Sequence, residues 1–154
     1  MRDLVCGAME HVCAGRWRDH IPGHSAAVYE AGTGMYVSYG GPLVLFACGV
    51  ATNLTVNRDT VRAVSELENK VGIGALHFGE QMNDGVCLLL TVRLHPRWLQ
   101  SADFSAKQIL IDVLSNLPTM ARDCGTTLLD SGVGGNLWID DDDDAWPLIV
   151  AGHL

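Results

Sequence analysis

Apolar and polar positions repeat along this chain with two periods, and the clearest helical period lies at 57–71. Apolar residues recur there at spacings of three and four, namely at Val61, Val64, Leu67 and Val71. Such spacing places them on one face of a helix. Asn57 precedes the pattern as a capping residue and Gly72 follows it as a helix stop. An amphipathic helix is therefore predicted between these two residues.

The strongest strand pattern follows this helix directly. Residues 73–78 form a short apolar run, and 82–85 have the composition of a turn. In the segment 86–95 the even-numbered positions from 86 to 94 are all apolar, whereas the odd-numbered positions are mixed. Because side chains in a strand alternate between two faces, the pattern predicts one apolar face, which we expect to lie under helices, and one mixed face.

The segments before the central helix predict one more helix and several strands. A helical stripe covers 2–17 and is broken by Pro22. Strand-like residues interrupted by glycine fill 26–39. The stretch 43–56 contains two apolar runs separated by Gly49, where we expect a bulge between two strands.

A second long helix is predicted after the alternating strand. Its stripe starts near Phe104, with Asp103 as the expected cap. Pro118 predicts a kink or a break near residues 114–117, and Gly125 is the expected end.

Taken in order, these elements predict an α+β fold of order α-β-β-β-α-β-β-α, with an antiparallel sheet of about five strands and helices packed on it. Residues 1–130 are expected to form a single domain. Residues 131–154 are expected to form a flexible tail, because they combine glycines, five consecutive aspartates at 140–144 and an apolar end that begins at Trp146. That end is long enough to dock on a sheet, its own or a neighbour's.

Composition narrows the classes of partner. The formal net charge is −8 and the ten basic residues are scattered, which argues against nucleic acid as a partner. Hydrophobic residues make up 48% of the chain and charged ones 18%, which favours an apolar surface and an oligomer. Five widely spaced cysteines without a C-x-x-C motif indicate a reduced compartment, and no segment approaches the roughly 18 apolar residues of a membrane span. A cytoplasmic protein without a membrane partner is expected.

The sequence offers one candidate metal site. His11, Cys13, His20 and His24 lie close together in the sequence, but Pro22 makes a helix that would align the last two histidines improbable. The favoured interpretation is that these are histidines in a mobile N-terminal segment, so neither a metal nor another cofactor is expected. No combination of nucleophile, base and oxyanion donors is recognisable elsewhere, and no catalytic residue is assigned.

The mixed face of the segment 86–95 is the predicted binding surface. Its positions Cys87, Leu89, Thr91 and Arg93 could meet a partner subunit or an extended segment of another protein, and an exposed edge strand could accept such a segment by strand addition. Trp146 is a further predicted binding residue, because the apolar end of the chain could dock on the chain's own sheet and be displaced by a partner. The alternative interpretation is a sheet face that simply meets solvent.

The order of these patterns resembles the YbjN family of bacterial proteins, which share the fold of type III secretion chaperones. The resemblance covers the two apolar runs of 43–56, the helix that ends in Glu68-Asn69, the segment 73–94 and the helix from Phe104 to Cys124. It implies a small acidic cytoplasmic protein that is often dimeric, has an antiparallel sheet backed by helices and lacks catalytic residues. Chaperones of this fold hold extended segments of client proteins.

Two functions are therefore expected from different classes. The first is a non-enzymatic protein-binding module, chaperone-like or regulatory, that acts as a homodimer. The second is a small-molecule or metal-dependent enzyme or ligand carrier that uses the N-terminal histidine and cysteine residues.

Overall fold

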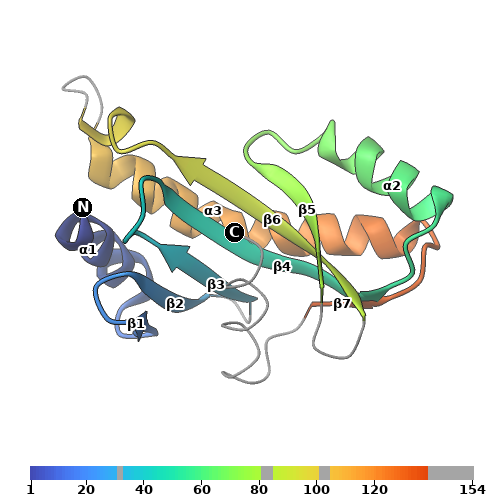
Figure 1. The fold of residues 1–154 in the computed structure, drawn as a ribbon, viewed down its shortest axis with the longest axis horizontal. Coiled ribbons are helices and arrows are strands. Elements are labelled where there is room, and N and C mark those ends of the chain that lie inside the picture. The colour runs from blue at the N-terminus through green and yellow to red at the C-terminus, as the bar shows by residue number, and fades with distance from the viewer. Residues whose placement is uncertain (31–32, 81–84, 101–104, 139–154) are drawn as a thin grey trace.

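The fold is known from a computed structural model that describes residues 1–30, 33–80, 85–100 and 105–138 (Figure 1). In chain order its elements are α1 (Arg2–Cys13), β1 (Trp17–Ile21), β2 (Ser25–Glu30), β3 (Thr33–Ser38), β4 (Val44–Leu54), α2 (Arg58–Glu68), β5 (Ala75–Glu80), β6 (Val86–Leu94), the short 3-10 helix η1 (Trp98–Gln100), α3 (Ala106–Asp130) and β7 (Asn136–Leu137).

The strands form one antiparallel sheet in the order β1-β2-β3-β4-β6-β5, and β7 pairs with β4. The five strands of six residues or more, β2 to β6, make up the body of the sheet, and the shorter β1 and β7 add to it. The predicted α+β class and the predicted order of helices and long strands are confirmed.

The three helices share a single hydrophobic core with one face of the sheet. Buried residues of α1, α2 and α3 belong to the same cluster as Leu88, Leu90 and Val92 of β6. In Figure 1, α3 passes behind β4 and β6, so the viewer looks at the face of the sheet opposite the helix. The prediction that the even-numbered face of β6 lies under helices is therefore confirmed.

The central helix begins as predicted and ends earlier. The Asn57 Oδ1 atom accepts a hydrogen bond from the Thr60 backbone N–H at 2.9 Å, which caps α2. The helix ends at Glu68 with Asn69 as its C-cap, so Gly72 is not the residue that stops it. The following strand begins later than predicted, at Ala75 rather than at residue 73.

One long strand replaces the two that were expected around Gly49. Strand β4 is continuous over 11 residues, and its pairing with β6 shifts register between Gly49 and Ala51, where the bulge was predicted. A bulge bends a strand without ending it, which explains why the two apolar runs form a single element.

Helix α3 differs from its prediction at both ends. Ser105 is its N-cap, and the predicted cap Asp103 lies outside the described residues. The helix continues through Pro118 without a break. Gly125 does not end it, because a Cβ there would overlap the Val50 carbonyl oxygen of β4. This glycine allows the helix to approach the sheet closely, and the helix continues for five more residues, to Asp130.

Candidate functional site

The candidate site lies on the outer face, the face of the sheet opposite the helices. The pairing places Tyr36 of β3 beside Ala47 of β4, and Gly49 of β4 beside Leu89 of β6. A second hydrophobic cluster, separate from the main core, lies there. We call it the outer-face cluster, and it consists of Tyr36, Ala47, Cys87, Leu89 and Trp138.

Three of the predicted binding residues are buried on this face. Cys87, Leu89 and Thr91 are only 0, 3 and 2% exposed, whereas Arg93 at the end of the row is exposed. The Thr91 hydroxyl donates to the Ala75 carbonyl oxygen at 3.4 Å, which satisfies its polar group inside the sheet. The expectation of a face free for a partner is wrong at these three positions.

Trp138 explains part of this burial. It is 7% exposed, it belongs to the outer-face cluster, and its indole lies directly against the Cα of Gly49, where a Cβ would overlap the ring. The Trp138 backbone N–H donates to the Val50 carbonyl at 3.2 Å. An aromatic side chain therefore packs on the outer face directly over a glycine, and we call this position the Gly49 site.

The chain reaches the outer face through a short added strand. Strand β7 pairs with the far end of β4, with Leu137 opposite Ala51 and Asn136 opposite Thr52. Before it, Gly132, Gly134 and Gly135 have φ values of +82°, +77° and +92°, a region that favours glycine. These glycines were expected to belong to a flexible tail, but they form the turn that carries the chain from α3 to the sheet.

Sequence reasoning missed Trp138 as a site residue and selected Trp146, which lies outside the described residues. The available signal was Gly49, because a glycine inside a strand often marks the close approach of another group. It was interpreted only as a bulge.

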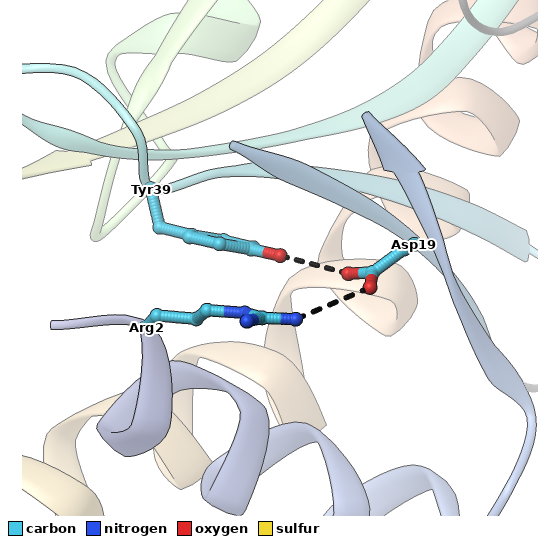
Figure 2. Close-up of polar contacts among 3 residues, drawn as sticks. All are labelled: Arg2, Asp19 and Tyr39. Atoms are coloured by element: carbon cyan, nitrogen blue, oxygen red, sulfur yellow. Dashed lines mark hydrogen bonds and ion pairs between the residues drawn. The ribbon is translucent and has the colours of Figure 1, made fainter. Parts of the chain in front are cut away.

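A polar cluster ties α1 to the sheet at the other end of the molecule. The Tyr39 hydroxyl donates to Asp19 Oδ1 at 3.0 Å, and Arg2 Nη2 lies 3.5 Å from Asp19 Oδ2 (Figure 2). Burial of the phenol, followed by its hydrogen bond to Asp19 and the charge of that carboxylate, raises the pKa of Tyr39 to about 12. Tyr39 therefore stays protonated at neutral pH, and the arrangement suits a structural tie rather than proton transfer.

A groove between α2 and α3 is a concave feature of the described residues. It has a volume of about 210 Å³ and is lined by Leu67, Lys70, Val71, Met120, Asp123, Cys124 and Thr127. Burial, and to a smaller extent the charge of Asp123, raises the pKa of the Cys124 thiol. A raised pKa keeps the group as a thiol, which is a weak nucleophile.

The residues of the candidate metal site are spread over three elements. His11 is exposed at the end of α1, Cys13 is buried in the main core, His20 lies in β1 and His24 lies in the turn that follows it. The His24 side chain packs against Gly40. Within the described parts of the chain, no group of three or more His, Cys, Asp or Glu residues is placed to hold a metal ion.

Fold and site together define an α+β protein whose helices cover one face of an antiparallel sheet and whose other face holds a short segment of its own chain. In comparisons with known proteins, no family model, curated protein or solved structure matches this chain. The resemblance to the YbjN family stays a prediction. Among the residues described, no helix is long and apolar enough to cross a membrane.

Proposed function

We propose that this protein is a non-enzymatic, cytoplasmic protein-binding module, chaperone-like or regulatory, that holds an extended segment of a partner protein on its outer face. The observation that carries the proposal is the position of residues 136–138. They add a strand to β4 and place one aromatic anchor, Trp138, over Gly49. The chain thus binds a segment of itself in the way that many domains bind peptides.

Strand addition explains how such a site can accept different sequences. Main-chain hydrogen bonds to a sheet edge supply affinity that does not depend on sequence, and a pocket for one side chain supplies specificity. Here the backbone bond from Trp138 to Val50 represents the first contribution, and the indole over Gly49 represents the second. A partner segment with an aromatic residue at the equivalent position would make the same contacts.

The chemistry of the outer-face cluster favours binding over catalysis. Its members are apolar or aromatic apart from the Cys87 thiol. Burial raises the pKa of that thiol, so it remains protonated and poorly nucleophilic near neutral pH. The proposal therefore involves no cofactor and no covalent step.

We also propose that the protein is a homodimer. Among the described strands, β1 and β5 are the outermost members of the sheet, and an edge strand can pair with another chain. Phe78 on β5 is 40% exposed, so this edge carries an apolar side chain as well as backbone groups. Sedimentation at micromolar concentration should give a dimer, and a monomer throughout would contradict this part of the proposal.

Selection of random peptides on the immobilised full-length chain tests the binding function. We expect enrichment of extended peptides that contain an aromatic residue, with tighter binding to the Trp138→Ala variant, because that variant lacks the internal occupant. Binding should be lost in Gly49→Ala, which places a methyl group at the Gly49 site, and should persist in the matched control Gly72→Ala, where a Cβ meets no atom within 4 Å.

Two outcomes would overturn the proposal. Equal binding of the selected peptides by Gly49→Ala and Gly72→Ala would mean that the peptides bind elsewhere. Failure to select any peptide, together with a small molecule or metal retained through purification, would favour the enzyme or carrier interpretation instead.

A further inference from the structure

The outer face changes from apolar to basic at the end of β6. Arg93 continues the row formed by the buried odd-numbered residues of that strand, and it is exposed. His95, Arg97 and Trp98 follow, and all three are exposed. We call these four residues, Arg93, His95, Arg97 and Trp98, the basic corner.

A tight turn holds the basic corner together. The Trp98 backbone N–H donates to the His95 carbonyl at 2.9 Å, and the Arg97 backbone N–H donates to His95 Nδ1 at 3.1 Å. Leu99, 6% exposed, anchors the turn in the main core. Trp98 nevertheless remains 64% exposed, the largest value among the exposed large apolar side chains of the described residues. The end of β6 and this turn thus place an aromatic residue and two arginines at the surface.

The described part of the chain supplies no carboxylate to these arginines. Two ion pairs of the described residues, Arg2 with Asp19 and Arg62 with Glu66, lie on other elements. The chain as a whole is nevertheless strongly acidic, and five of its negative charges fall in the aspartate run at 140–144. Charge complementarity therefore connects the basic corner with the segment that follows Trp138.

The position of Trp138 gives this run a fixed starting point. Trp138 lies on Gly49, which pairs with Leu89, and Arg93 is four residues further along β6. At about 3.3 Å per residue, that separation is roughly 13 Å along the strand. An extended chain spans up to about 3.3–3.6 Å per residue, so Asp142, four residues after Trp138, can reach the level of Arg93.

We infer that the aspartate run 140–144 docks on the basic corner of its own chain, where its carboxylates pair with Arg93 and Arg97. The segment after β7 then crosses the outer face from the Gly49 site to the end of β6. This inference deepens the proposed function and depends on it in one respect. A partner segment that replaces the internal one would carry acidic residues after its aromatic anchor.

A labelled peptide of residues 139–154 tests the inference against two forms of the full-length chain. One form is wild type, and the other has the five aspartates of 140–144 replaced by asparagine. A tethered segment has an effective concentration in the millimolar range, so it should exclude the free peptide from the wild-type protein. We expect the peptide to bind the asparagine variant at least about tenfold more tightly than wild type, with an affinity that falls as salt is added.

Charge reversal locates the docking position. Adding Arg93→Glu and Arg97→Glu to the asparagine variant should abolish peptide binding, and the milder Arg93→Gln and Arg97→Gln pair should weaken it. The matched control is Arg58→Glu with Arg122→Glu, which changes the net charge equally at two exposed positions on helices α2 and α3. This control should bind the peptide like the asparagine variant.

Three results would overturn the inference. The first is equal binding of the peptide to wild type and to the asparagine variant, and the second is equal binding with and without the reversed arginines. The third is a dimer of the wild-type protein that dissociates when the arginines are reversed, because the occupant would then be a second copy. In each case, peptides selected at the Gly49 site would still support the proposed function. Failure of this inference can therefore be distinguished from failure of the proposed function.

Discussion

Replacing Gly49 by alanine should destabilise the protein far more than one methyl group normally does. The new Cβ would occupy the position of the Trp138 indole, so the ring must leave the outer-face cluster. The variant therefore has the consequence of a tryptophan deletion although the tryptophan itself is unchanged.

The expected magnitude follows from the burial of Trp138, which is 7% exposed. A buried tryptophan removes about 150–250 Å² from water, which corresponds to about 4–6 kcal/mol at roughly 25 cal/mol per Å². This value is an upper bound, because unfolded chains already bury some apolar area. Truncations of buried tryptophan cost about 3–5 kcal/mol, so Trp138→Ala should fall in this range. Gly49→Ala should lower the free energy of unfolding by about 3 kcal/mol. The loss is smaller than for Trp138→Ala because alanine restricts the unfolded chain, which stabilises the native state by up to about 1 kcal/mol.

The decisive measurement is chemical denaturation of Gly49→Ala, of Trp138→Ala and of the double variant that combines the two substitutions. Once the indole is gone, a Cβ at position 49 meets no ring, so the double variant should be about as stable as Trp138→Ala alone. The two effects are then strongly non-additive, as expected for residues in direct contact. The control Gly72→Ala should change the free energy of unfolding by less than about 0.5 kcal/mol.

Additive effects would refute this reasoning, because they would mean that Gly49 and Trp138 act independently. An unchanged free energy of unfolding for Gly49→Ala would refute it as well. In that case the indole would have to reach an equally buried position without the glycine. Tryptophan fluorescence of the native state distinguishes a ring that has entered solvent from one that has only shifted.

Three further substitutions test other parts of the structure. Gly125→Ala should lower the free energy of unfolding by about 1–3 kcal/mol in a denaturant titration, because the methyl group pushes α3 away from the Val50 carbonyl, although alanine favours a helix. The pKa of Tyr39 is raised from 10.0 to about 12, so its protonated form stabilises the native state fully below pH 10 and this contribution is lost between pH 10 and 12. The pH dependence of the free energy of unfolding across this range should disappear in Tyr39→Phe, and an identical alkaline slope in the variant would contradict the raised pKa of Tyr39. Asn57→Ala should cost about 1 kcal/mol through loss of the α2 cap, measured by helical circular dichroism during denaturation.

The parts of the fold that could be predicted are those that local periodicity determines. The stripe of α2 and its Asn57 cap are readable because the helix needs only residues within one or two turns. The alternation of β6 likewise identified which side chains lie under the helices. Element ends were less accurate, since Gly72 and Gly125 were taken as local stops. The environment of Gly125 depends on a strand far away in the sequence, and composition does not reveal such contacts.

The burial of the outer face could not be predicted for a related reason. Cys87, Leu89 and Thr91 have the same mixed composition whether the face meets solvent, a partner or a segment of its own chain. Only the turn after α3 decides between them, because it brings Trp138 back to the sheet. The glycines of that turn were assigned to a flexible tail, because their number and spacing do not specify where the chain goes next.

The internal occupant sets a condition on any partner of the outer face. Because residues 136–138 are tethered to α3, their effective concentration at the Gly49 site is in the millimolar range. A partner segment that made only the same contacts would therefore lose the competition at ordinary cellular concentrations. It must gain at least about 4 kcal/mol elsewhere to bind at micromolar concentration, since every tenfold requires about 1.4 kcal/mol. Contacts to Arg93 and Arg97 count toward this amount only where the partner binds them more tightly than the chain's own aspartate run does, so binding should depend on both the aromatic anchor and the charge that follows it.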